Sequence, residues 1–257
     1  MRVLGRRSGP HRLVGMGRSL VVFVHGTRTT RHEWDGYETL LPQAQVLAID
    51  LPGHGELQHV ACTRESVLAT IDDAVAQASP RQPVLVVGHS LGGYFSALWA
   101  QERRTRGQPG PDALVLVGSS GDPKSMLGWI YKGFAKLLPI VGFERMTRLA
   151  NRMYRILGEK GELHGPEAYE ALSDAWAIVF GECGPDNLRD IECPVVLVNG
   201  QFDQMRVHAN QFAAAARRPA QYIVPRATHM LPVTHAEALA GIVADVIEEG
   251  VRTCARG

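Results

Sequence analysis

The stretch 84–93, VLVVGHSLGG, decides the fold because it joins two kinds of secondary structure through a very tight turn. Its first four residues are apolar at consecutive positions, which is typical of a strand covered on both faces of a sheet. Leu91 opens a helical pattern, so the strand and the helix meet at Ser90. Such a turn holds Ser90 in a strained backbone conformation, and side chains two residues before and after it would collide. Gly88 and Gly92 meet this requirement because neither has a side chain.

Similar apolar runs recur along the chain, with helical patterns between them. Helical patterns cover 65–78, 91–102 and 236–249; the first has an apolar stripe of 3.6-residue period, and Thr63 is expected to cap it. Alternating strands and helices predict an α/β fold, a mostly parallel central sheet with helices on both faces. The predicted strands cover residues 21–24, 45–50, 84–87, 113–117, 195–198 and 221–224.

One long stretch, 122–190, interrupts this alternation. It has no clear strand, and its aromatic residues fall in helix-like patterns. Structureless loops of that length are uncommon in compact domains, so we expect a helical insertion. The chain then divides into a first core part at 1–121, the insertion at 122–190, and a second core part at 191–257.

Composition and charge narrow the class of protein. The 257 residues are 45% hydrophobic, enough for a substantial core, and 27 basic residues balance 26 acidic ones. A formal net charge of +1 gives no field that would attract nucleic acid or anionic membranes. No apolar run approaches the roughly 18 residues needed to span a bilayer, and no secretory segment is recognisable. We expect a soluble cytoplasmic protein that acts on a small molecule, with its oligomeric state left open.

Taken in order along the chain, four features resemble the α/β-hydrolase superfamily. The 88–92 turn matches its G-x-S-x-G nucleophile elbow, and HGT at 25–27 matches its oxyanion loop. DLPGHG at 50–55 resembles a turn common in the family, and the order Ser…Asp…His is the family's order. The resemblance implies that Ser90 is a nucleophile and that the 122–190 insertion forms a cap over the active site. It also implies a serine hydrolase that cleaves an ester, thioester or related acyl bond of a small hydrophobic substrate through an acyl-enzyme.

A serine hydroxyl becomes a good nucleophile only when a base removes its proton, and histidine has a suitable pKa. His229 follows the last predicted strand and precedes the last helix. In a doubly wound sheet this loop returns to the carboxyl edge, where Ser90 lies, and ATHMLP at 227–232 resembles the family's histidine loop. His229 is therefore the predicted base, with His235 as the alternative.

The base needs an acid that fixes its tautomer and stabilises the imidazolium. Asp203 follows the predicted strand at 195–198 and matches the family's usual acid position. Asp122 follows the preceding strand, at 113–117, and some members of the family place the acid there. Both candidates remain open at this stage.

The resemblance also implies the remaining contacts of the site. The backbone amides of Thr27 and Leu91 would form the oxyanion hole, with the Thr27 hydroxyl as a further possible donor. Apolar residues of the cap would line the substrate pocket, with contacts expected from Met126, Trp129 and Tyr131. No metal and no organic cofactor is expected, because the sequence contains neither a ligand cluster nor a phosphate-binding loop.

Other polar residues near these motifs are expected to have structural roles. His89 is predicted to point away from the nucleophile and to pack, while His25 and His54 are predicted to form hydrogen bonds within loops. Asp50 is predicted to form a turn.

Two other functions fit the same residues. The triad could perform carbon–carbon bond hydrolysis, lyase chemistry or acyl transfer, because the same groups serve all three reactions. A non-enzymatic ligand receptor could also keep the fold and use the pocket for binding.

Overall fold

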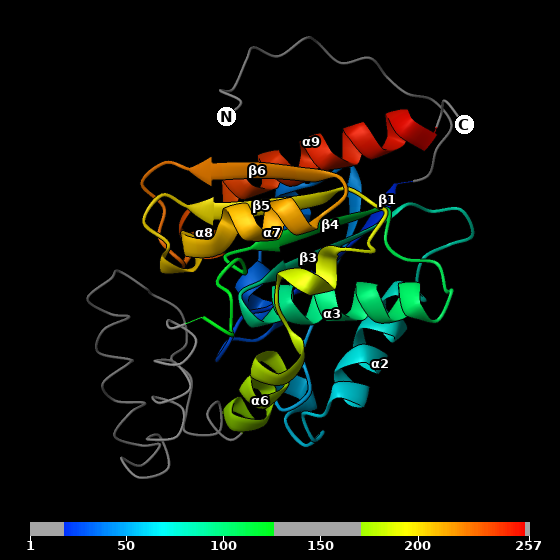
Figure 1. Cartoon of the computed structure of the whole chain (residues 1–257). Coiled ribbons are helices and arrows are strands. Elements are labelled where there is room, and N and C mark those ends of the chain that lie inside the picture. Colours follow the sequence, from blue (N-terminus) through cyan, green and yellow to red (C-terminus); the bar gives the residue numbers. More distant parts are fainter. Residues whose placement is uncertain (1–17, 126–170, 255–257) are drawn as a thin grey trace.

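The computed structural model describes residues 18–125 and 171–254 of the chain. In this part, six parallel strands form one sheet in the order β2-β1-β3-β4-β5-β6 (Figure 1). Each predicted strand lies on one of the six, and only Asp50 falls beyond a strand end. The α/β fold class is therefore confirmed. The strands are β1 (Ser19–Val24), β2 (Ala44–Ile49), β3 (Val84–His89), β4 (Ala113–Val117), β5 (Val195–Gly200) and β6 (Pro219–Val224).

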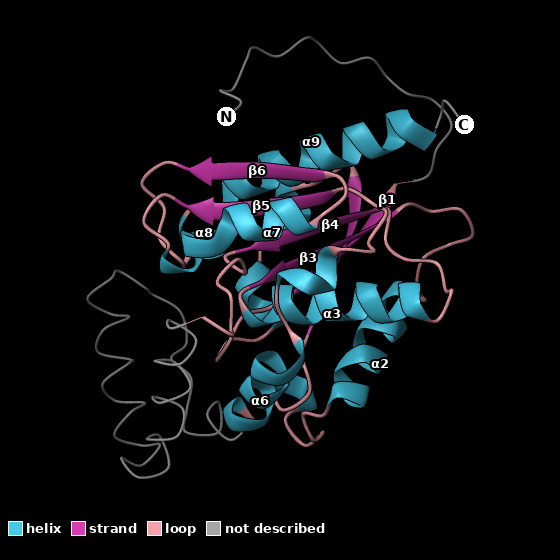
Figure 2. Cartoon of the chain, in the orientation of Figure 1, coloured by secondary structure: helices cyan, strands magenta, loops and turns pink. Residues whose placement is uncertain are grey.

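Helices cover both faces of the sheet, and alternate residues of a central strand contribute to two separate cores. Leu20 and Val22 of β1 belong to one core, whereas Val21 and Phe23 belong to the other. Figure 2 shows α9 on the opposite side of the sheet from α2 and α3. The first core includes α2 (Arg64–Val75), α3 (Leu91–Thr105), α6 (Leu172–Glu182) and α7 (Ala209–Ala215). The second includes η1 (Arg31–Trp34), α1 (Tyr37–Leu40), α8 (Leu231–Thr234) and α9 (Ala236–Cys254).

The edge strand β6 differs from the prediction that the strands are covered on both faces. Its burial alternates, and Ile223 is 57% exposed while Val224 is buried. An edge strand has a neighbouring strand on one side only, so helices packed on the middle of the sheet cover it incompletely. The consecutive apolar residues of the β6 sequence therefore predicted the strand correctly but its burial wrongly.

The predicted helices are present, with shifted ends. Thr63 caps α2 as expected: its hydroxyl accepts a hydrogen bond from the Ser66 amide at 3.2 Å, and the Ser66 hydroxyl accepts one from the Thr63 amide at 3.0 Å. This helix ends at Val75, earlier than predicted, whereas α3 and α9 extend further. Within residues 18–125 and 171–254, no helix is long and apolar enough to cross a membrane.

The described part of the insertion between β4 and β5, residues 122–125 and 171–190, contains helices and no strand. It contains α6 and a short 3-10 helix, η4 (Pro185–Leu188). Ala175 and Val179 of α6 are buried in the same core as α3. The three residues expected to contact substrate, Met126, Trp129 and Tyr131, lie outside the described residues.

Candidate active site

Ser90 lies at the sharp turn between β3 and α3, as the sequence predicts. Its backbone φ is +49° and its ψ is −115°, a conformation that L-residues adopt at a cost of about 1–3 kcal/mol. Neighbouring hydrogen bonds hold this conformation. The Ser90 amide donates to the Val117 carbonyl of β4 at 2.8 Å, and the Ser90 carbonyl accepts from the Gly93 amide at 3.0 Å. The turn thus places the Ser90 hydroxyl at the carboxyl end of the sheet.

The glycines around Ser90 are required by close backbone contacts. A Cβ atom on Gly88 would lie 2.5 Å from the Gly92 carbonyl oxygen. A Cβ atom on Gly92 would lie 2.4 Å from the carbonyl oxygen of Val24, at the end of β1. The expected collision is confirmed, and for Gly92 the obstacle is the neighbouring strand.

We predict that Gly92→Ala lowers the free energy of unfolding by about 3 kcal/mol, because backbone atoms cannot move aside as a flexible side chain can. Urea denaturation followed by circular dichroism would measure the change. Gly241→Ala in α9 is a matched control, since nothing lies within 4 Å of its added Cβ atom. Equal stability of the Gly92→Ala variant and the wild type would contradict the close packing at this turn.

Ser90, His229 and Asp203 meet at the carboxyl edge of the sheet. His229 Nε2 lies 3.0 Å from Ser90 Oγ, and His229 Nδ1 lies 3.0 Å from Asp203 Oδ1. His229 lies between β6 and α8, and Asp203 follows β5. The Asp203 side chain is fully buried, whereas 23% of the His229 side chain is exposed. These contacts join three segments that are far apart in the sequence.

The charge state of Asp203 follows from its surroundings. Burial opposes ionisation, but hydrogen bonds from His229 and from the Met205 amide, together with the electrostatic attraction of the His229 ring, outweigh it. The net result is a lowered pKa of Asp203, so this carboxyl group is ionised at neutral pH. An ionised Asp203 can accept the Nδ1 proton of His229, which leaves Nε2 free to accept a proton from Ser90.

Two glycines let the loops of Asp203 and His229 approach each other. A Cβ atom on Gly200 would lie 2.5 Å from the carbonyl oxygens of Ala227 and Thr228. Gly118 has a φ of +57°, and a Cβ atom there would lie 3.0 Å from both Asp203 Oδ2 and His229 Nδ1. A residue without a side chain thus follows β4, and another ends β5, where the contact between Asp203 and His229 forms.

The alternative acid and base lie apart from this contact. The Asp122 carboxylate accepts a hydrogen bond from the Lys124 amide at 2.9 Å, and the Asp122 amide donates to His208 Nδ1 at 3.0 Å. His235 directly follows α8, and its Nδ1 lies 2.9 Å from the Thr234 hydroxyl. Among the described residues, neither Asp122 nor His235 contacts Ser90 or His229.

The expected oxyanion loop lies beside Ser90. A Cβ atom on Gly26 would lie 3.4 Å from Ser90 Cβ, so Thr27 follows a residue that lies close to the serine. Thr27 Oγ1 is buried and has no hydrogen-bond partner among the described residues. Leu91 is the first residue of α3, and the amides of a first helical turn have no acceptor within their own helix. Leu91 is therefore adjacent to Ser90 and Thr27 follows a residue close to it, and the role of their amides stays a prediction.

Loop roles predicted for three residues are confirmed. His25 Nε2 accepts a hydrogen bond from the Leu51 amide at 3.0 Å, and burial and the nearby His54 lower the pKa of His25 to about 4. His54 Nδ1 lies 3.1 Å from the Pro52 carbonyl oxygen. The Asp50 carboxylate accepts from the amides of Arg31 and Glu56, at 2.8 and 3.0 Å, and so fixes the turn after β2.

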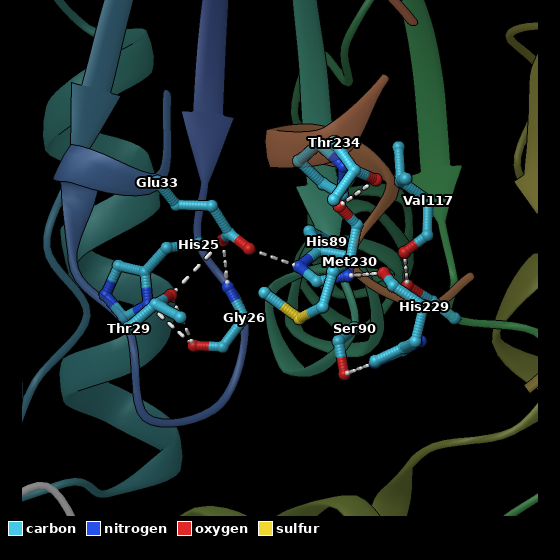
Figure 3. A network of polar contacts seen from close by, with 12 residues as sticks. His25, Gly26, Thr29, Glu33, His89, Ser90, Val117, His229, Met230 and Thr234 are labelled. Carbon is cyan, nitrogen blue, oxygen red and sulfur yellow. Dashed lines mark hydrogen bonds and ion pairs between the residues drawn. The ribbon is translucent and has the colours of Figure 1, made fainter. Parts of the chain in front are cut away.

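The packing predicted for His89 is only part of its role. Its ring lies 4.9 Å from that of His229, centroid to centroid, but the ring also has two polar contacts, and one of the partners, Glu33, was not predicted from the sequence. His89 does not simply pack: its Nδ1 lies 2.6 Å from Glu33 Oε1, and its Nε2 lies 3.0 Å from the His229 carbonyl oxygen (Figure 3). Glu33 lies in a polar segment, RHEW at 31–34, with no sequence signal that marks it as buried. Only the tertiary structure brings it to the end of β3.

The chain belongs to the alpha/beta hydrolase family, because that family's sequence profile matches residues 21–242. This confirms the resemblance stated from the motifs. The solved structure of a thermophilic esterase from Thermogutta terrifontis has the same fold, with a TM-score of 0.71 and 20% identity over 91% of this chain and 92% of that one.

Two curated relatives extend the comparison. The chain is 27% identical to the pimeloyl-[acyl-carrier protein] methyl ester esterase of Neisseria meningitidis, over 90% of this chain and 94% of that protein. It is 32% identical to the 2-succinyl-6-hydroxy-2,4-cyclohexadiene-1-carboxylate synthase of Serratia proteamaculans, over 104 residues. That second match spans only 40% of each chain, so less than half of the synthase is covered.

Proposed function

We propose that the protein is a serine hydrolase that cleaves an ester, thioester or related acyl bond of a small hydrophobic substrate through an acyl-enzyme. One observation carries the proposal: an unbroken series of contacts runs from Ser90 Oγ through His229 to Asp203, with both distances at 3.0 Å. A nucleophile, a base and an orienting acid at hydrogen-bonding distance are the arrangement that acyl transfer requires.

In the first half of the proposed reaction, Ser90 Oγ attacks the substrate carbonyl carbon while His229 Nε2 takes the hydroxyl proton. The carbonyl oxygen becomes negative and is stabilised by the amides of Leu91 and Thr27. Each such donor typically contributes about 3–4 kcal/mol to stabilisation of the transition state. His229 then gives its proton to the departing alcohol or thiol, which leaves an acyl group on Ser90.

In the second half, a water molecule replaces the leaving group. His229 takes a proton from the water, and the resulting oxygen nucleophile attacks the acyl carbon. The negative oxygen is stabilised again by the same two amides, and the bond to Ser90 Oγ breaks as that oxygen regains its proton from His229. Throughout, the ionised Asp203 stabilises the positive charge on His229.

The comparisons support ester hydrolysis as the reaction class. The Neisseria relative is named as a methyl ester esterase and aligns over 90% of this chain. An apolar substrate pocket formed by a helical cap at 122–190, with Met126, Trp129 and Tyr131 as contacts, remains part of the proposal. The described end of that insertion, α6, buries the apolar residues Leu172, Ala175 and Val179 and is thus compatible with an apolar cap.

A second candidate reaction is lyase or carbon–carbon bond chemistry by the same three residues. The observation that favours it is the 32% identity to the Serratia synthase over 104 residues. Both reactions need a base that accepts a proton from Ser90 or from a substrate held beside it, so the geometry alone suits either. Turnover of simple esters separates the two, because only the hydrolase proposal requires it.

A panel of p-nitrophenyl esters with increasing acyl length is the corresponding experiment. We expect hydrolysis above the Ser90→Ala background, and an acyl length with the highest kcat/KM. Labelling with a fluorophosphonate, which reacts with activated serines, should be seen for the wild type and not for Ser90→Ala. If the wild type neither hydrolyses any ester nor takes the label, the hydrolase proposal fails and a ligand receptor becomes the better explanation.

A further inference from the structure

A buried pair of side chains, Glu33 and His89, connects two loops on either side of Ser90. Glu33 lies in η1, after β1, and its side chain is only 1% exposed. Its Oε2 accepts hydrogen bonds from the Gly26 amide at 2.7 Å and from the Thr29 hydroxyl at 3.2 Å. Glu33 therefore fixes both ends of the turn that contains Thr27.

His89 connects Glu33 to the loop of the proposed base. Its Nδ1 contacts Glu33 Oε1 at 2.6 Å, and its Nε2 contacts the His229 carbonyl oxygen at 3.0 Å. Figure 3 shows this series of contacts from Gly26 through Glu33 and His89 to the backbone of His229. Both partners of the His89 ring are acceptors, and a neutral imidazole has only one N–H. With Glu33 ionised, the two contacts are both hydrogen bonds only when His89 is protonated.

The surroundings of the two side chains support a charged pair. Burial lowers the pKa of His89, but the charge and hydrogen bond of Glu33 outweigh it and raise that pKa overall. Burial raises the pKa of Glu33, but the charge and hydrogen bond of His89 and the Gly26 amide lower it overall. A buried ion pair contributes little stability compared with apolar residues of similar size. Stability alone therefore does not explain two charges at this position.

We propose that Glu33 and His89 are positioning residues, which hold the oxyanion loop and the His229 loop in register on either side of Ser90. This inference rests on the proposed function, because it assigns the pair to the same reaction. The close packing of Gly26, His89 and Ser90 supports this role. A Cβ atom on Gly26 would lie 2.7 Å from His89 Nδ1 and 3.4 Å from Ser90 Cβ. Glu33 and His89 together form a bridge between the two loops. A shift in this bridge would change the position of both the proposed oxyanion donor, Thr27, and the proposed base, His229.

Two substitutions of Glu33 separate geometry from charge. Glu33→Ala removes the bridge, and we expect kcat for p-nitrophenyl acetate to fall about 100-fold with little change in KM, since a displacement near 1 Å can cost that much. Glu33→Gln can keep the bridge. Its oxygen accepts from the Gly26 amide, and its NH2 group donates to Nδ1 of a neutral His89, which still donates from Nε2 to His229. We expect kcat of this variant within about tenfold of the wild type.

Asp72 provides a matched control for the structural effect of losing a charged contact. Its carboxylate accepts from Trp99 Nε1 at 2.8 Å and from Arg103 Nη1 at 2.6 Å, and so joins α2 to α3. Asp72→Ala should lower the melting temperature but leave kcat within about twofold, because it touches neither Ser90 nor His229. If Glu33→Ala does not fold, Glu33→Met/His89→Phe replaces both charges by apolar groups of similar size, and the same loss of kcat is expected.

The results that overturn the inference are specific. A folded Glu33→Ala variant with wild-type kcat would do so, and so would a Glu33→Gln variant as impaired as Glu33→Ala. Failure of the proposed function can be distinguished from failure of this inference. If the proposed function fails, the wild type itself takes no fluorophosphonate label. In that case crystal structures of wild type and Glu33→Ala decide: a displaced His229 loop supports the bridge, and a Ser90 Oγ to His229 Nε2 distance unchanged within about 0.5 Å overturns it.

Discussion

Ser90→Ala is expected to lower kcat for p-nitrophenyl acetate by about 10⁵-fold or more. Without the hydroxyl no acyl-enzyme forms, and His229 has no proton to take from position 90. The small remaining rate would come from a water molecule attacking a substrate bound beside the amides of Leu91 and Thr27. Steady-state kinetics over a range of substrate concentrations would measure the loss.

Two measurements make this result interpretable. The Ser90→Ala variant should melt within a few degrees of the wild type, because alanine meets the same backbone strain as serine at φ +49°. His235→Ala is the matched activity control, since that ring contacts Thr234 and not Ser90. Ester hydrolysis by Ser90→Ala at a rate close to that of the wild type would show that another group is the nucleophile.

The second large effect is expected from Asp203→Asn, which should lower kcat about 10³- to 10⁴-fold. Asp203 Oδ1 accepts from both His229 Nδ1 and the Met205 amide, and an asparagine oxygen can keep these contacts. The neutral amide cannot stabilise the positive charge that His229 acquires during the reaction. Its NH2 group would also be a buried donor at the position of Oδ2, which has no partner among the described residues.

Asp122→Asn is the matched comparison, with the same chemical change on the loop that follows β4. Its oxygen can still accept from the Lys124 amide, so kcat should stay within about threefold of the wild type. The two variants measured side by side decide the assignment of the acid. A large loss in Asp122→Asn together with a small loss in Asp203→Asn would reassign that role to Asp122.

Local chemistry explains why much of this fold could be predicted from the sequence. Consecutive apolar residues such as 84–87 are typical of a strand buried on both faces, and the structure has buried side chains there on both sides of the sheet. The turn at Ser90 was predictable because its glycines are required by nearby backbone atoms. Thr63 was predictable as a helix cap because a hydroxyl accepts from the free amides of a first turn.

Other features depend on tertiary contacts that no local pattern carries. Asp122 follows β4 and Asp203 follows the adjacent strand β5, so the sequence offers both as the acid. Only the path of its loop places Asp203 against His229. Glu33 resembles a solvated surface residue in the sequence, and it is buried because β1 and β3 are neighbours in the sheet. The exposure of Ile223 likewise follows from the edge position of β6, which depends on the strand order of the whole sheet.

A crystal structure of the protein after reaction with a fluorophosphonate tests the central claim most directly. We predict a phosphorus atom bound to Ser90 Oγ, with its oxygen at hydrogen-bonding distance from the amides of Leu91 and Thr27. His229 Nε2 should lie within hydrogen-bonding reach of the bonded Ser90 oxygen. A label on any other residue, or a phosphonyl oxygen that points away from both amides, would contradict the account.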